Sequence, residues 1–323
     1  MIAVIILGEV FAYAYNPHRF DADCEWTTDE VAYEVYSSGS DVYDVLLLDD
    51  SRPLMDAFIY VDEKHTIFNA YMGPAIGYVE VDSQYYAEQI QIYASIRGFT
   101  SMTIGGSEDL ASYISNTSQS PYGHAVISAS FSLPGTVYAG NADDPLLNWI
   151  SDGGSLYWTA SEIGASYWDA EGLHHVSNGQ LLFLGSQCQN LVLDGGEATL
   201  DGHGFRDALN LKTSQPMFGI DIALAGSCLP LSYVTDGVSA ITMLAHGEGN
   251  ICMMGGKPDI DQYDDFGQIL ASGIDYDTVL SYHDEGHVVR GTTTDTISVS
   301  SSEQTLFVYI GGIYTVYGRL FIQ

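Results

Sequence analysis

The stretch from Phe99 to Gly164 constrains the fold most, because it alternates short apolar runs with runs of helical spacing. The first apolar run, Thr100-Ser-Met-Thr-Ile-Gly-Gly, ends in glycines. Residues 107–116 then begin with a helix cap and repeat apolar side chains every three to four positions. This order predicts a strand followed directly by a helix.

A second unit of the same kind follows in the chain. The run His124-Ala-Val-Ile-Ser-Ala-Ser-Phe-Ser-Leu-Pro has the composition of a buried strand, and residues 143–154 carry acids and Pro145 at the start and a glycine stop. The chain then enters the apolar run 155–160. Strands that alternate with helices predict a parallel sheet with helices on both faces.

Two motifs give this region a family resemblance. They are Trp149-Ile-Ser-Asp-Gly-Gly-Ser-Leu-Tyr-Trp and His246-Gly-Glu-Gly-Asn-Ile-Cys-Met-Met-Gly-Gly. Both resemble the class I glutamine amidotransferase-like fold, and more closely its non-catalytic relatives, such as the domain that mediates trimerisation in some β-galactosidases. The resemblance covers the middle half of the chain and implies an amidotransferase-like α/β domain.

The resemblance also bears on catalysis. Active amidotransferases place a Cys nucleophile on the sharp turn after the strand that follows the Gly-Gly helix. The corresponding turn here is Thr159-Ala-Ser-Glu-Ile-Gly, so Ser161 or Glu162 occupies it and no Cys does. We therefore expect a scaffold rather than an enzyme. A catalytic alternative stays open, in which Ser161 is the nucleophile and His246 its base.

The two chain ends have a different pattern, of strands without helices. Residues 30–36, 42–48 and 57–61 alternate or run apolar, and residues 297–300 and 305–322 supply further strands. The N-terminal part resembles the small β-sandwich modules of secreted prokaryotic proteins. We predict a β-sandwich domain from residues 1–95 with 286–323, an α/β domain from 96–285, and a connecting helix near residues 83–97.

The first fifteen residues allow two interpretations. They are mostly apolar, but they lack a basic n-region and Glu9 interrupts them. We interpret Ile2 to Tyr15 as a buried strand or as one that pairs with another subunit; a remnant export signal is the alternative. No other segment approaches the ~18 apolar residues that a membrane span needs, so we expect no transmembrane segment.

The charge balance limits the partners. The chain has 42 acidic residues against nine Lys and Arg, a net charge of -33, and 23 tyrosines. Such a chain repels phosphate backbones and anionic lipids, which argues against nucleic acid and favours divalent cations; solubility in a salty or acidic medium explains the same charge. Tyrosine-rich, lysine-poor surfaces are typical of interfaces and also of strands.

Candidate site residues are few. A turn-rich loop containing Asp194, Glu197 and Asp201, and a second acidic run with Asp259 and Asp261, could supply oxygen ligands to Ca²⁺, the only cofactor that we consider. The alternatives are a hairpin turn for the first run and a helix cap for the second.

Two covalent features are also candidates. Cys188 and Cys228 follow similar Gly-Ser turns, which suggests a disulfide between them. Asn116-Thr-Ser is the one glycosylation sequon of the chain.

These observations favour an archaeal or bacterial extracellular or cell-surface structural protein. It would self-associate as a homo-oligomer or polymer, such as a surface-layer, sheath or filament subunit. The alternative is a secreted protein that binds or hydrolyses carbohydrate, with acids around Glu162 and Asp194 as its working groups.

Overall fold

The computed structural model describes the central part of the chain in most detail. Side chains are described for residues 54–64, 80–160, 162–190, 211–213, 217–226, 228–232 and 237–276. Backbone strands alone are described for residues 3–6, 18–20, 31–36, 43–49, 67–71, 78–79, 191, 234–235, 288–291, 295–299, 304–310 and 318–320.

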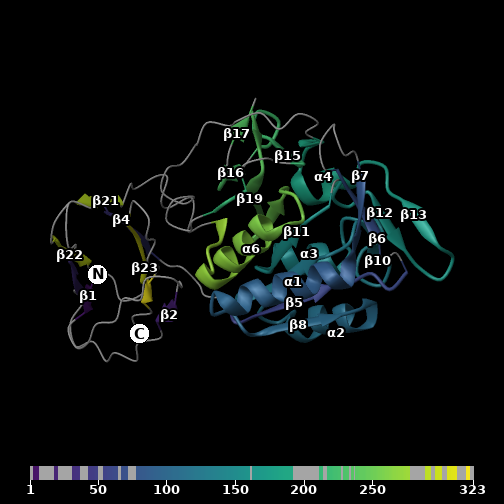
Figure 1. Cartoon of the computed structure of the whole chain (residues 1–323). Coiled ribbons are helices and arrows are strands. Elements are labelled where there is room, and N and C mark those ends of the chain that lie inside the picture. The colour runs from purple at the N-terminus through teal and green to yellow at the C-terminus, as the bar shows by residue number, and fades with distance from the viewer. Residues whose placement is uncertain are drawn as a thin grey trace.

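A seven-stranded, mostly parallel sheet forms the centre of this part (Figure 1). Its five parallel strands are β8, β5, β9, β11 and β20, and β19 and β16 extend it in antiparallel fashion. Their bounds, in sheet order, are β16 Cys228–Pro230, β19 Ile241–His246, β20 Gly249–Met254, β11 Ser155–Trp158, β9 His124–Ser128, β5 Asp56–Tyr60 and β8 Met102–Gly105. This confirms the predicted mixed α/β class.

Helices cover both faces of the sheet, because the parallel strands are apolar on both sides. One face packs against α1 (Ser83–Ile96) and α6 (Ile260–Ser272), which lie side by side (Figure 1). The other packs against α2 (Ser107–Thr117), α3 (Pro145–Ser151) and α4 (Gly179–Leu184). Consecutive residues of β5 alternate between the two cores, with Ile59 in the first and Tyr60 in the second.

Helix boundaries follow local chemistry, except that the predicted side-chain cap at residue 107 is absent and Gly106 is the N-cap of α2. The Asp82 side chain accepts the Tyr85 amide to cap α1, and Pro145 begins α3. Gly273 ends α6 in the left-handed conformation at φ 62°, which glycine adopts without steric cost. The three helices predicted near residues 83–97, 107–116 and 143–154 are therefore confirmed as α1, α2 and α3.

Strands from the two chain ends pair with each other. In separate sheets, β3 lies between β1 and β22, β4 lies between β21 and β23, and β2 pairs with β24. Their labels group on the side of Figure 1 where both termini lie. The bounds are β1 Ala3–Ile6, β2 His18–Phe20, β3 Val31–Tyr36, β4 Tyr43–Asp49, β21 Val288–Gly291, β22 Asp295–Val299, β23 Gln304–Ile310 and β24 Gly318–Leu320.

One strand departs from the expected division. Residues 57–61, which we expected in the N-terminal β region, contribute to β5 inside the central sheet. Their buried, unbroken apolar run fits a strand covered on both faces better than a half-exposed one. The division of the chain into two domains, and the packing of the end sheets into a sandwich, stay predictions.

Shorter sheets complete the described part. One contains β10, β12 and β13, another contains β14, β15, β18 and β17, and β6 pairs with β7. Their bounds are β6 Ile67–Tyr71, β7 Tyr78–Asp82, β10 Leu133–Pro134, β12 Ser166–Trp168, β13 Leu173–His175, β14 Gln189–Leu191, β15 Phe218–Asp221, β17 Val234–Thr235 and β18 Val238–Ser239. None of the helices in the described residues combines the length and hydrophobicity that a membrane crossing needs.

Candidate functional site

The carboxyl edge of the parallel sheet is the first place to look for a site. The strands lie in the order β8-β5-β9-β11-β20, so the chain adds β8 on one side of β5 and then β9, β11 and β20 on the other. Ligands of open α/β sheets commonly bind at such a switch point, here between β5 and β9. Asp62, two residues beyond the end of β5, lies at this point and is fully buried. Its carboxylate accepts hydrogen bonds from the hydroxyls of Ser130 (3.2 Å) and Ser132 and from the Lys64 amide (2.8 Å).

Neighbouring side chains close this edge. The Trp168 indole donates to the Tyr60 hydroxyl at 3.0 Å, and the Lys64 ammonium lies 5.7 Å from the centre of the Trp168 ring. Burial raises the pKa of Tyr60 far above its ordinary value. Asp62 is inaccessible to solvent, and its hydrogen bonds join the loop after β5 to the loop after β9. We therefore interpret it as a structural residue, and we call this contact the Asp62 lock.

The structure places two of the three predicted catalytic residues, Glu162 and His246, at opposite edges of the parallel sheet. Ser161 lies outside the described residues, and its neighbour Glu162 is exposed beyond the carboxyl end of β11, with φ 61°. His246 pairs with Gly249 at the opposite, amino end of the parallel strands, and its Nδ1 lies 2.8 Å from the Phe183 carbonyl oxygen. Four strand residues, on the order of 13 Å, separate the two levels. The proposed Ser161–His246 pairing therefore gains no support.

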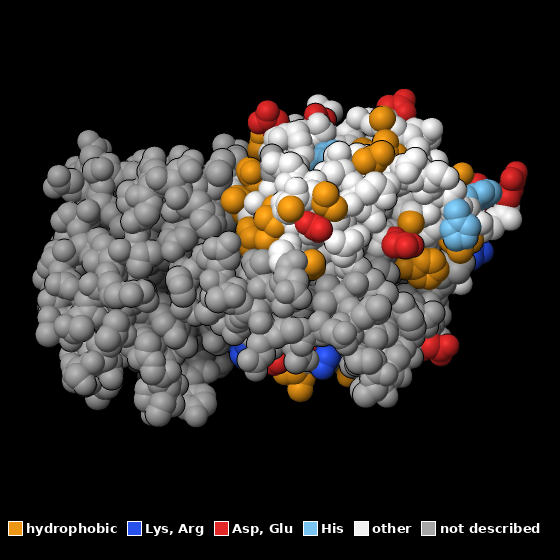
Figure 2. Space-filling model, turned by 90° about the horizontal axis from the view of Figure 1, so that it is seen from above, with side chains coloured by type: hydrophobic (Ala, Val, Ile, Leu, Met, Phe, Trp, Pro, Cys, Tyr) orange, Lys and Arg blue, Asp and Glu red, His pale blue; other side chains and the backbone are white. Residues whose placement is uncertain are grey.

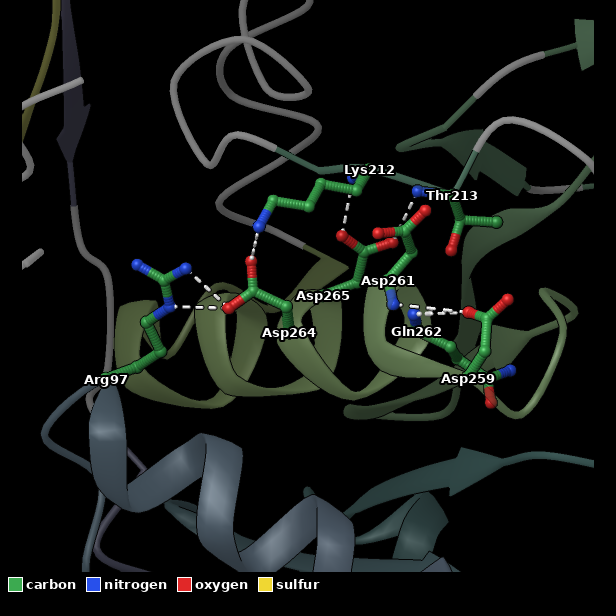
Figure 3. Close-up of polar contacts among 8 residues, drawn as sticks. All are labelled: Arg97, Lys212, Thr213, Asp259, Asp261, Gln262, Asp264 and Asp265. Carbon is green, nitrogen blue, oxygen red and sulfur yellow. Dashed lines mark hydrogen bonds and ion pairs between the residues drawn. The ribbon is translucent and has the colours of Figure 1, made fainter. Parts of the chain in front are cut away.

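Of the predicted metal-binding residues, some lie outside the described part of the chain and others lie within it. Asp194, Glu197 and Asp201 lie outside the described residues. Asp259 accepts the amides of Asp261 and Gln262 as the N-cap of α6 (Figure 3), so the helix-cap alternative is confirmed for it. Among the described residues, no three His, Cys, Asp or Glu side chains gather as a metal site.

A buried charged cluster joins α6 to α1 and to residues 211–213 (Figure 3). The Asp264 carboxylate contacts the Arg97 guanidinium, whose Nε is 2.8 Å away, and the Lys212 ammonium at 2.6 Å. The next carboxylate, Asp265, accepts the amides of Lys212 (2.6 Å) and Thr213 (2.8 Å). Burial raises the pKa of Asp265 to about 7, against the lowering effect of these donors. Sequence alone showed these acids but not their partners.

A hollow opens at the amino edge of the parallel sheet, opposite the Asp62 lock. Its volume is about 470 Å3, and it lies where β9, β11 and β20 begin and α6 ends. The described side chains that line it include Tyr122, Glu248, Asn250, Asp275 and Tyr276. The Tyr122 hydroxyl donates to Glu248 at 3.4 Å. Sequence reasoning missed this site, because its residues come from five separate segments of the chain.

The structure also describes the residues of the predicted disulfide and of the glycosylation sequon. Cys188 and Cys228 are free thiols, so the structure does not contain the predicted disulfide, and burial raises the pKa of both. The two thiols belong to the same core cluster, and Cys188 contributes to the raised pKa of Cys228, so a bond between them stays a prediction. Asn116 is exposed in the last turn of α2.

Comparisons with known proteins give only distant similarity. No protein-family model and no curated protein sequence matches the chain. Among solved structures, an exo-β-1,4-mannosidase, Op5Man5 from Opitutaceae bacterium strain TAV5, is similar over 72% of this chain and 36% of its own, at 12% identity and a TM-score of 0.34. A β-galactosidase from Rahnella sp. R3 is similar over 80% and 41%, at 16% identity and a TM-score of 0.39.

Both similarities are too low to carry an argument about function. This chain spans well under half the length of either enzyme. The amidotransferase-like fold also stays a prediction.

Proposed function

We propose that this protein is a structural protein of the cell surface or extracellular space that self-associates through the outer face of helix α1, which carries a single charge. Its α/β part, which we interpret as an amidotransferase-like scaffold, is non-catalytic in this proposal. The absence of Cys from the turn at residues 159–164 supports that part of the proposal.

The observation that supports this proposal most is the row of exposed apolar side chains on the outer face of α1. Tyr85, Ile92 and Ile96 are 55%, 48% and 50% exposed, and their spacing of seven and four residues places them along one side of the helix. Glu88, which lies on the same side three residues after Tyr85 and four before Ile92, is the only carboxylate or base among the fourteen residues of α1. We call Tyr85, Ile92 and Ile96 the α1 stripe.

The net charge of -33 makes an apolar stripe a favourable place for two copies of the chain to meet. Two copies repel each other wherever acidic surfaces meet, so association is least opposed where acids are few. Figure 2 shows how few Lys and Arg side chains the described surface offers as alternative contacts on the face in view. Burying each half-exposed isoleucine would contribute on the order of 1 kcal/mol.

The test is to add charge to the α1 stripe. The double variant Ile92→Glu/Ile96→Glu should remain folded, because glutamate favours helices and both positions are exposed. Sedimentation velocity over a wide concentration range should show association at least tenfold weaker than that of the natural protein. The matched control is Leu181→Glu/Leu224→Glu, which adds the same charge at two exposed leucines outside α1.

Two results would reject the proposal. One is a natural protein that stays monomeric at every concentration. The other is an equal loss of association in the control variant, since that would show a general charge effect and not a role of the α1 stripe.

The carbohydrate alternative receives less geometric support. Of its two working groups, Glu162 is exposed at the carboxyl edge, and Asp194 lies outside the described residues. No carboxylate pair across a cleft can therefore be assigned to them.

A further inference from the structure

The last parallel strand of the central sheet, β8, has a partner strand on one side only. It pairs with β5, and it lies near the lower margin of the central part in the view of Figure 1. The Val61 amide donates to the Gly105 carbonyl oxygen at 3.0 Å, so the backbone groups of Gly105 face β5. Successive residues of a strand turn these groups to opposite sides. Those of Ile104 therefore face outward, where no strand of the described residues pairs with them.

The sequence of β8 does not protect this open edge. Soluble proteins commonly protect edge strands with a charge, a proline or a bulge, which hinder pairing with other chains. The opposite edge strand of the same sheet, β16, ends in Pro230, which has no amide N–H to donate. The strand Met102–Gly105 contains neither proline nor charge, and its register with β5 is unbroken. At four residues it is short, so its surroundings must also favour a contact.

The surroundings of β8 are unusually poor in acids. Acids make up 42 of the 323 residues, yet none occurs between Glu88 and Glu108. The one base in that segment, Arg97, contacts the buried Asp264. The exposed side chains of residues 98–104 are neutral hydroxyls: Thr100, Ser101 and Thr103. An equally acidic second copy can therefore approach this edge without bringing acids together, whereas a basic partner is attracted to the acidic surfaces instead.

An acid at one end of β8 favours a particular direction of pairing. A Cβ on Gly105 would lie 2.9 Å from a carboxylate oxygen of Asp109, so Asp109 is next to the carboxyl end of the strand. A parallel pair of β8 strands would bring the two Asp109 side chains together. A two-fold axis makes the strands antiparallel and places each Asp109 toward the neutral Thr100 end of the other copy.

We propose that β8 is a second self-association site, at which β8 of another copy adds antiparallel about a two-fold axis and continues the seven-stranded sheet into that copy. The site is separate from the α1 stripe. The Gln91 side chain donates to the Met102 carbonyl oxygen at 3.3 Å and so marks the side of α1 toward β8, and Ile92 lies about 100° around the helix from it.

Two separate two-fold contacts join each chain to two neighbours, so the copies can continue into a polymer. The polymer rests on the proposed function, because it needs the α1 stripe as well. The β8 contact does not.

Sedimentation velocity of full-length variants separates the two contacts. The variant Ile92→Gln/Ile96→Gln removes the apolar side chains of the α1 stripe without adding acids, and its residual association should stop at a dimer. Adding Thr103→Glu places an acid on the exposed edge and should weaken that dimer at least tenfold. The matched control adds Ser177→Glu, at an exposed position outside β8 and α1, and should change the dimer affinity less than twofold.

Hydrogen exchange measures the backbone contact itself. In the Ile92→Gln/Ile96→Gln protein, the Ile104 amide should exchange at least tenfold more slowly at high protein concentration than at low concentration. Adding Thr103→Glu should remove this difference. Because Thr103 and Ser177 are exposed, both substitutions should leave the protein folded, and circular dichroism checks this.

Three outcomes would overturn the β8 proposal. They are an Ile92→Gln/Ile96→Gln protein that is monomeric at every concentration, equal weakening by Ser177→Glu, and Ile104 exchange that does not change with concentration. A different result would separate the two contacts: if Ile92→Gln/Ile96→Gln associates as strongly as the natural protein and Thr103→Glu abolishes that association, the β8 contact stands and the α1 stripe is rejected.

Discussion

The two helical layers of the central sheet place their charges in opposite ways. On α2, the acids Glu108 and Asp109 lie exposed in the first turn, where they meet the positive end of the helix. In the α1–α6 layer, Asp264 and Asp265 are buried and bound by partners, while the outside of α1 carries the apolar α1 stripe.

Exposure to solvent accounts for the composition of the outer side of α2 but not for that of α1. The exposed side of α2 is made of Ser, Asn and acidic residues, as an ordinary solvated helix requires. The exposed side of α1 has two isoleucines and a tyrosine with little charge between them. A chain with so many acids has placed almost none on this helix, which is the basis of the proposed interface.

The largest expected effect concerns the buried charge of Asp265. Its folded-state pKa is about 7, whereas an unfolded Asp titrates near pH 4. The folded protein therefore binds more protons between these values, and the free energy of unfolding should fall as pH rises from about 4 to about 7, by on the order of 4 kcal/mol.

Urea unfolding at a series of pH values measures this. Other carboxylates also titrate, so the informative quantity is the difference between the natural protein and Asp265→Asn, whose amide resembles the neutral carboxyl group. The variant should lose this fall with pH, and it should be less stable than the natural protein near pH 4, because its NH2 group cannot accept one of the two backbone amides that Asp265 binds. Parallel stability curves for the two proteins would contradict the buried position of Asp265.

A somewhat smaller effect is expected at the seam between α1 and α6. Arg97→Ala leaves the buried Asp264 with Lys212 as its remaining ionic partner and should lower the free energy of unfolding by about 3 kcal/mol. On the opposite layer, Glu108→Ala removes an exposed charge and should change it by less than about 0.5 kcal/mol. Chemical denaturation compares the two variants, and equal effects would remove the distinction between the layers.

Much of the central fold could be predicted from local sequence signals. Pro145 and the glycines after residue 152 set the ends of α3 that the structure contains, whereas the side-chain cap predicted at the start of residues 107–116 does not form, because Gly106 is the N-cap of α2. The position of β5 could not be read in the same way, because a short apolar run fits either an outer or a buried strand. Its partners, β8 and β9, decide the matter, and they follow it by more than forty residues.

The sites were less predictable because they depend on three-dimensional proximity. The acidic run at residues 259–265 was visible, yet only the packing of α6 shows that Asp259 caps the helix while Asp264 meets Arg97. Glu248 was hidden within the Gly-x-Gly motif that resembled a family feature. Similar Gly-Ser contexts at Cys188 and Cys228 suggested a bond that the structure does not contain.

Hydroxyl-radical footprinting at low and high protein concentration tests the central claim most directly. The account predicts that Tyr85, Ile92 and Ile96 lose reactivity as concentration rises, while exposed positions elsewhere, such as Leu181 and Leu224, keep theirs. If the α1 stripe stays equally reactive at concentrations where sedimentation shows association, α1 is not the interface and the account is wrong.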